Sequence, residues 1–154
     1  MGRFTGGGVV RLQPPVESEP VVKITHGFTL HCDELLSNNL EINWGNGENW
    51  HINPKGEFIS VVCTDDEEFD PEPPPAPVDK ICAEAWGDYN GESRSKIAFC
   101  LGDAGEPGGK NDKASMTITP PGGGDPVLEV FWDVIVSGNI QAHYDQPHGS
   151  KPNK

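Results

Sequence analysis

Residues 22–32 alternate between two kinds of side chain with a period of two, and this pattern constrains the fold more than any other feature. One face carries Val22, Ile24, His26, Phe28, Leu30 and Cys32, and the other carries Lys23, Thr25, Thr29 and His31. Alternation over this length is typical of a strand with one buried face. We therefore predict a strand here, in which Gly27 marks a β-bulge or the close approach of another backbone.

The composition extends this prediction to the whole chain. Of 154 residues, 19 are glycine and 15 are proline, and only 34% are hydrophobic. Such a composition favours short strands joined by many turns, and no segment shows a sustained helical period. No apolar stretch approaches the ~18 residues of a membrane-spanning helix. We predict an all-β, disulfide-stapled single domain of about 8–10 short strands, a β-sandwich or a partly open β-barrel.

The domain is expected to cover residues 1–143. Within it, residues 1–8 form a Gly-rich arm and residues 64–79 form an acidic, proline-rich crossing loop, while residues 144–154 form a flexible tail. The segment 127–136 is the most apolar strand and is expected at the centre of the sheet. A hairpin centred on Gly47 would pair Trp44 with Trp50.

The chain has four cysteines: Cys32, Cys63, Cys82 and Cys100. None has the spacing of a zinc site, and their even number favours two disulfides, for which three connectivities exist. A hairpin centred near Gly91 places Cys82 opposite Cys100, with a Cα separation of ~4.4–6.8 Å. Cys32 and Cys63 are then the other pair. A reduced intracellular protein is the alternative.

The net charge is −13, from 24 acidic and 11 basic residues, and no basic stripe interrupts it. This charge opposes binding to nucleic acid or to an anionic membrane, so we expect neither nucleic-acid binding nor membrane insertion. Residues 1–8 lack the hydrophobic region of a signal peptide. We expect the sequence to be a mature or excised domain of a secreted or cell-surface protein.

Several short motifs follow one another along nearly the whole chain. They are GRFTGGG at 2–8, THGFTLHCD at 25–33, NNLEINWG at 38–45, CTDD at 63–66, YNG at 89–91, DAGEPG at 103–108, NDKA at 111–114 and GNIQAH at 138–143. In this order they resemble a module of bacterial extracellular proteins, often found near the C-terminus after immunoglobulin-like or other repeated domains. The resemblance implies a secreted or surface-attached module without established enzymatic activity. Cys82 and Cys100 depart from it as an additional staple.

One Gly-rich loop carries Asp103, Glu106, Asn111 and Asp112, and Asp125 follows in a second loop. Calcium requires ~6–8 oxygen ligands on flexible turns, which these residues would supply. Their spacing differs from that of an EF-hand, and Asp and Asn are also ordinary turn residues. Calcium is therefore a hypothesis beside the turn interpretation, and the sequence establishes no cofactor.

Three histidines, His26, His31 and His143, are candidate ligands for a transition metal. In a regular strand His26 and His31 point to opposite faces, with His31 on the polar one. A shared site therefore requires the bulge at Gly27. The alternative is a buried, hydrogen-bonded His26 with a structural role.

Three aromatic residues, Trp50, Trp86 and Tyr89, are candidates for stacking on sugar rings, because exposed planar side chains bind such rings. By contrast, Trp44 and Trp132 lie in apolar alternation, where packing in the core is the ordinary explanation.

No nucleophile elbow, phosphate-binding loop or His-Glu-x-x-His motif occurs. We predict a non-catalytic secreted or cell-surface module for binding, adhesion or extracellular assembly. Its partner is another extracellular protein, a polysaccharide, or a second copy that receives the arm 1–8 as an added strand. The alternatives are a metal-dependent extracellular hydrolase or oxidase that uses His26, His31 and His143, and a carbohydrate-binding module.

Overall fold

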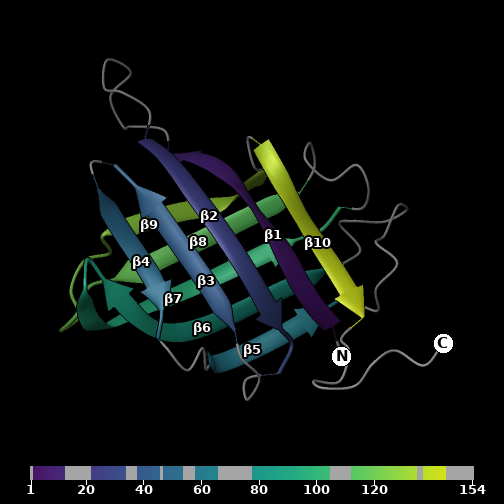
Figure 1. The fold of residues 1–154 in the computed structure, drawn as a ribbon, viewed down its shortest axis with the longest axis horizontal. Helices are drawn as coiled ribbons and strands as arrows, with labels where there is room; N and C mark the ends of the chain where they lie inside the picture. The colour runs from purple at the N-terminus through teal and green to yellow at the C-terminus, as the bar shows by residue number, and fades with distance from the viewer. Residues whose placement is uncertain are drawn as a thin grey trace.

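The described residues form a single strongly curled sheet of ten antiparallel strands, an open half-barrel (Figure 1). The computed structural model describes residues 2–12, 22–33, 38–45, 47–53, 58–65, 78–104, 112–134 and 137–144. The strands are β1 (Gly2–Leu12), β2 (Val22–His31), β3 (Asn39–Trp44), β4 (Glu48–Ile52), β5 (Phe58–Thr64), β6 (Lys80–Tyr89), β7 (Glu92–Gly102), β8 (Lys113–Thr119), β9 (Leu128–Val134) and β10 (Ser137–Tyr144). The all-β prediction is confirmed.

The sheet folds over itself to make two layers. Its strand order is β10-β1-β2-β3-β4-β6-β7-β8-β9, and β5 pairs with β6 beyond the end of β4. In Figure 1 the front layer of β10, β1, β2, β3 and β4 lies over β5, β6, β7 and β8, which cross behind it. These strands and β9, the partner of β8, form the back layer. The steep crossing is typical of orthogonal sheet packing.

Alternate residues of both layers point inward and form the core. Burial alternates strictly along β3 and β8, as a half-buried strand requires. The largest fully buried apolar side chains are Phe4, Ile24, Leu30, Ile42, Trp50 and Ile140 from the front layer and Ile81, Ile97, Leu101 and Ile118 from the back layer. Removing this apolar surface from water is the main stabilising term, about 25 cal/mol per Å².

Both predicted disulfides are present. Cys32–Cys63 joins the end of β2 to β5, with Cα atoms 5.9 Å apart. Cys82 and Cys100 are register partners on β6 and β7, and their Cα atoms lie 4.1 Å apart, slightly closer than predicted. Two disulfides are typical of proteins that fold in an oxidising environment.

The predicted bulge at Gly27 and the predicted free arm at residues 1–8 are both wrong. β2 pairs in regular register with β1 and with β3 across Gly27. The glycines of residues 2–8 belong to β1, which pairs with β10 on one side and with β2 on the other. A Cβ at Gly7 would lie 2.6 Å from the His26 carbonyl oxygen. The glycines therefore allow close packing of neighbouring strands, and β1 has no free edge with which to join a second copy.

Two predictions about strand position are also wrong. The apolar segment 127–136 was expected at the centre, whereas β9 lies at one edge of the sheet and exposes 75% of Phe131. The β3–β4 hairpin pairs Trp44 with Glu48 and Ile42 with Trp50, so its centre is residue 46. Apolar content indicates burial of a strand's face but leaves its place in the strand order undetermined.

We expect the Gly87→Ala variant to lose about 3 kcal/mol of unfolding free energy, because overpacked sites force backbone shifts. A Cβ at Gly87 would collide with the His51 carbonyl oxygen and the Trp50 ring. The matched control is Gly27→Ala, whose Cβ meets no atom within 4 Å. Urea denaturation of both variants measures the difference. Equal stability of the two would contradict the packing described here.

Candidate binding surface

The three aromatic residues predicted to stack on a ligand lie in different environments. Trp50 is fully buried and packs against Gly87, so the prediction is wrong for this residue. Tyr89 is partly buried and stacks on Trp44, with ring centroids 5.8 Å apart. Trp86, by contrast, exposes 47% of its surface on β6. Of the three, Trp86 is the one whose indole is available to a ligand.

The hydroxyl group of Tyr89 has a structural role. Oε2 of Glu48 accepts hydrogen bonds from the Tyr89 hydroxyl at 2.5 Å and from Nδ2 of Asn90 at 2.6 Å. These bonds lower the pKa of Glu48, and the same bond to Glu48 raises the pKa of Tyr89. Oδ1 of Asn90 in turn accepts the Asn49 amide. The network fastens β4 to the β6–β7 turn.

Two of the three candidate metal-binding histidines, His26 and His31, point to opposite faces of β2, and the side chain of the third, His143, lies outside the described part of the structure. Regular pairing of β2 places His26 on the inner face and His31 on the outer face. The backbones of His31 and His143 both pair with Arg3, which therefore lies between them. His31 is buried, in contrast to the predicted solvent-facing position, and its amide donates to Oδ1 of Asn38 at 2.6 Å. A site that contains both His26 and His31 is therefore not formed.

His26 is a buried core residue, although the predicted hydrogen bond is absent. Neither ring nitrogen has a hydrogen-bond partner among the described residues. The ring stacks on Phe28, with centroids 5.9 Å apart. Burial lowers the pKa of His26 from 6.5 to about 4, because the charged imidazolium would lose its hydration. His26 is therefore neutral at physiological pH.

Two of the predicted calcium ligands accept backbone amides. Oδ1 of Asp112 accepts from the Ala104 amide and Oδ2 from the Ile140 amide, both at 2.8 Å. Oδ2 of Asp103 accepts from the Ala142 amide, also at 2.8 Å. Both carboxylates are almost completely buried. Their oxygens hold the free side of β10, and this role supports the structural interpretation of the loop.

Of the other predicted calcium ligands, the structure describes only Asp125. Glu106 and Asn111 lie outside the described residues. Asp125 follows β8, whereas Asp112 precedes it, so these two residues lie at opposite ends of that strand. Over the part of the chain that the structure describes, no three His, Cys, Asp or Glu side chains group closely enough to hold a metal ion.

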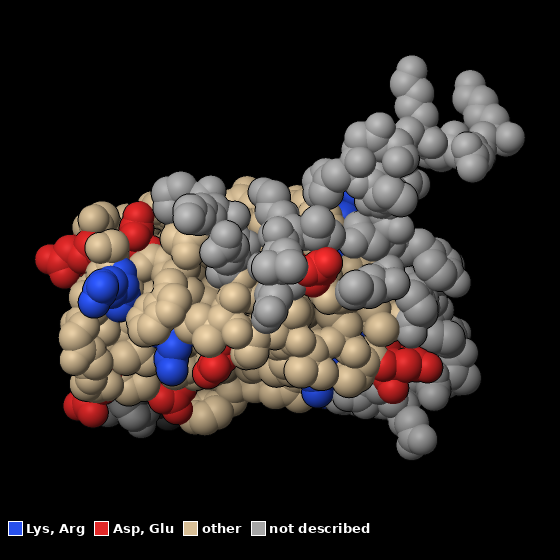
Figure 2. All heavy atoms as spheres, turned by 90° about the horizontal axis from the view of Figure 1, so that it is seen from below, with Lys and Arg blue, Asp and Glu red and all other residues tan. Residues whose placement is uncertain are grey.

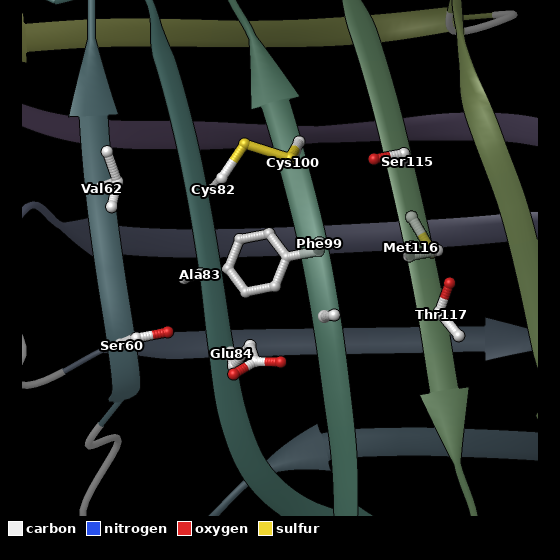
Figure 3. Close-up of a pocket in the computed structure, with 11 residues that line it drawn as sticks. Ser60, Val62, Cys82, Ala83, Glu84, Phe99, Cys100, Ser115, Met116 and Thr117 are labelled. Carbon is white, nitrogen blue, oxygen red and sulfur yellow. A yellow bond between two sulfur atoms is a disulfide. The ribbon is translucent and has the colours of Figure 1, made fainter.

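The outer face of the back layer is hollowed. A shallow groove of about 370 Å³ lies over β5, β6, β7 and β8. Figure 3 shows the Cys82–Cys100 disulfide on this face, with front-layer strands crossing behind it. Small or polar side chains, including Ala98, Ser115 and Thr117, line the groove beside the disulfide. We call this hollow the outer groove.

Trp86 stands at one end of the same face. The pairing of β6, β7 and β8 puts Trp86, Lys96 and Thr119 in one row across the strands. A hollow of about 320 Å³ contains these three residues together with Arg94. A separate hollow of about 340 Å³ is also lined by Trp86 and Arg94. These two side chains therefore border both hollows.

Within the described part of the chain, the exposed large apolar side chains lie on the back layer. Among the described residues, the exposed large hydrophobic side chains are Ile59, Val62, Trp86 and Phe131, on β5, β6 and β9. The outward positions of β2 and β3 instead carry exposed Thr25, Thr29, Asn39, Glu41 and Asn43. Val62 borders the outer groove and Trp86 borders the hollow beside it, whereas Phe131 lies on the edge strand β9. Apolar exposure at the groove and the hollow favours this layer as an interaction surface.

Charged groups on the surface are scattered. In the view of Figure 2, basic side chains of the described residues lie singly among acidic ones and form no continuous stripe. On the back layer, Nζ of Lys96 lies 3.9 Å from Oε1 of Glu84, and Nζ of Lys80 lies 4.6 Å from the centroid of the Trp132 ring. Such a distribution provides isolated cations, unlike the extended basic surface of a nucleic-acid-binding protein.

Comparison with protein-family models, curated proteins and solved structures finds no match to the chain. Within the described residues, no helix is long and apolar enough to cross a membrane.

Sequence reasoning found Trp86 but missed Arg94, Lys96 and Thr119. The Gly91-centred hairpin already implies that Trp86 faces Lys96, so this pair was accessible from the sequence. Arg94 was not, because the register shifts between Gly87 and Tyr89. Thr119 required knowledge that β8 pairs with β7.

We expect the Asp112→Asn variant to lose about 3 kcal/mol of unfolding free energy. The substitution replaces one of the two accepting oxygens by an NH₂ group, which donates hydrogen bonds. One buried backbone N–H then has no acceptor. The control Asp125→Asn alters an exposed turn residue and should change little. Thermal and urea unfolding measure both variants. An unaffected Asp112→Asn protein would show that these bonds contribute nothing to stability.

We expect His26 to make stability fall as the pH drops from about 6.5 to about 4. The unfolded chain binds a proton at this histidine in that range whereas the folded chain does not, so acid favours unfolding by about 3 kcal/mol. Above pH 6.5 and below pH 4 the contribution is constant. Urea denaturation of the wild type and of His26→Phe across this range tests it. Parallel stability curves for the two proteins would contradict the prediction.

Proposed function

We propose that the protein is a non-catalytic, extracellular binding module whose contact surface is the outer face of the back layer. The concentration of exposed apolar side chains on this face carries the proposal. The two disulfides support a location outside the reducing cytosol. The resemblance to secreted bacterial modules agrees with this location. Secretion, adhesion and extracellular assembly all belong to the proposal.

The shape of the surface favours an extended polymer as its ligand. The outer groove runs over several strands, and Trp86 lies four residues beyond Cys82 on β6, about 13 Å along the strand. Trp86 thus lies at a distance from the groove that one small molecule would not span. A single polymer chain would contact both the groove and the indole.

The chemistry of the surface favours a polysaccharide among such polymers. An indole offers a flat apolar face to the C–H groups of a sugar ring, while hydroxyl groups accept and donate hydrogen bonds at its edge. Trp86 supplies the indole, and Ser60, Ser115 and Thr117 supply hydroxyl groups in the groove. We therefore propose binding to extracellular polysaccharide, through which the module would attach a larger protein to a cell surface or matrix.

The test is co-sedimentation of the protein with a panel of neutral and acidic insoluble polysaccharides. We expect binding to at least one of them, and we expect Trp86→Ala to weaken it at least tenfold, because a desolvated tryptophan anchor contributes more than ~1.4 kcal/mol. The control Thr25→Ala lies on the front layer and should bind like the wild type. Near-UV circular dichroism verifies that both variants are folded.

If no polysaccharide binds, or if Trp86→Ala binds as tightly as Thr25→Ala, the proposed function is wrong.

A further inference from the structure

Arg94 occupies an unusual backbone conformation beside Trp86. Its φ angle is +70°, in the left-handed region that residues other than glycine rarely adopt. The register of β6 and β7 shifts here, because Gly87 pairs with Ser95 whereas Tyr89 pairs with Glu92. Ser93 and Arg94 therefore face the single residue Asp88, the arrangement of a β-bulge. Bulges redirect side chains and recur beside functional sites.

The guanidinium of Arg94 stabilises no contact between described elements of the fold. It makes no ion pair or hydrogen bond with another described residue. The neighbouring Lys96, by contrast, lies 3.9 Å from Glu84. An exposed guanidinium without a carboxylate partner is a ready-made site for a planar anion, which it binds through two parallel N–H donors.

Trp86 and Arg94 together line both hollows at this end of the face. An indole and a guanidinium on one wall match a ligand that combines a flat apolar ring face with a negative charge at its edge. Thr119 and Lys96 line one of the hollows and add donors for hydroxyl groups. A pyranose ring that bears a carboxylate has each of these properties.

We propose that Trp86 and Arg94 bind a uronate unit of an acidic polysaccharide. The sugar ring stacks on the indole of Trp86, and the carboxylate accepts hydrogen bonds from the guanidinium of Arg94. This proposal rests on the proposed function and specifies its ligand. The protein's net charge of −13 opposes binding of a polyanion in general. Salt screens charges separated by more than ~8 Å at physiological ionic strength, so the charges within that distance of Arg94 decide the interaction at contact.

The test is isothermal titration of the protein with polygalacturonate and with alginate. Each polymer is also tested after its carboxyl groups have been reduced to primary alcohols, so that the charge alone is removed. We expect the native form of at least one polymer to bind at least tenfold more tightly than its reduced form. Trp86→Ala should weaken binding to both forms.

The Arg94 variants separate the guanidinium from the ring contact. Arg94→Gln should bind the native polymer only as tightly as the wild type binds the reduced one. Arg94→Gly should lose the same preference, and its melting temperature should be equal or higher because glycine accepts the positive φ. The control Lys23→Gln removes one exposed positive charge from β2 on the front layer and should keep the preference.

The outcomes distinguish this inference from the proposed function. Equal binding of native and reduced polymers, or an unchanged preference in Arg94→Gln, overturns the uronate site and leaves a polysaccharide-binding module. The same conclusion follows if neither native uronate polymer binds while a neutral polysaccharide binds through Trp86. Binding of poly-glutamate that matches the native polymers would identify an acidic peptide as ligand and overturn the uronate site. No Trp86-dependent binding to any polysaccharide overturns both proposals.

Discussion

The fold depends on how two buried carboxylates hold the last strand. β10 pairs with β1 on one side only, so its other side presents backbone amides that need acceptors. Asp112 accepts the Ile140 amide and Asp103 accepts the Ala142 amide. Through its second oxygen Asp112 also accepts the Ala104 amide just after β7. The carboxylates therefore connect the free side of the front layer to the ends of back-layer strands.

This connection gives several of the sequence motifs a structural role. DAGEPG and NDKA supply the two aspartates, and GNIQAH supplies the amides that they accept. The glycines of GRFTGGG allow β10 and β2 to approach β1 closely. Asn38, the first residue of NNLEINWG, accepts the amide of His31, which lies near the end of THGFTLHCD. These motifs hold the strands together, and the candidate binding surface therefore lies largely outside them.

The front and back layers share the same alternation of inward and outward residues, but their outward residues differ in chemistry. Along β6 and β8 the inward residues build the core, and the outward residues form the outer groove and the row of Trp86, Lys96 and Thr119. The front layer uses the same alternation but carries threonine, asparagine and charged residues outward. The two layers are therefore alike in backbone and different in the chemistry they present to solvent.

The sequence by itself determined the all-β class and the inward residues of most strands, because both depend on alternation within one strand. It also determined the β6–β7 register and with it the pairing of Cys82 with Cys100, because both depend on neighbours within one hairpin. Contacts between distant segments were decided only by the tertiary structure. They placed β1 inside the sheet and β9 at its edge, buried Trp50 under Gly87, and turned the predicted calcium ligands Asp103 and Asp112 towards β10. The bulge that sets Arg94 beside Trp86 was also decided only by the tertiary structure, because it results from a register shift that alternation does not encode.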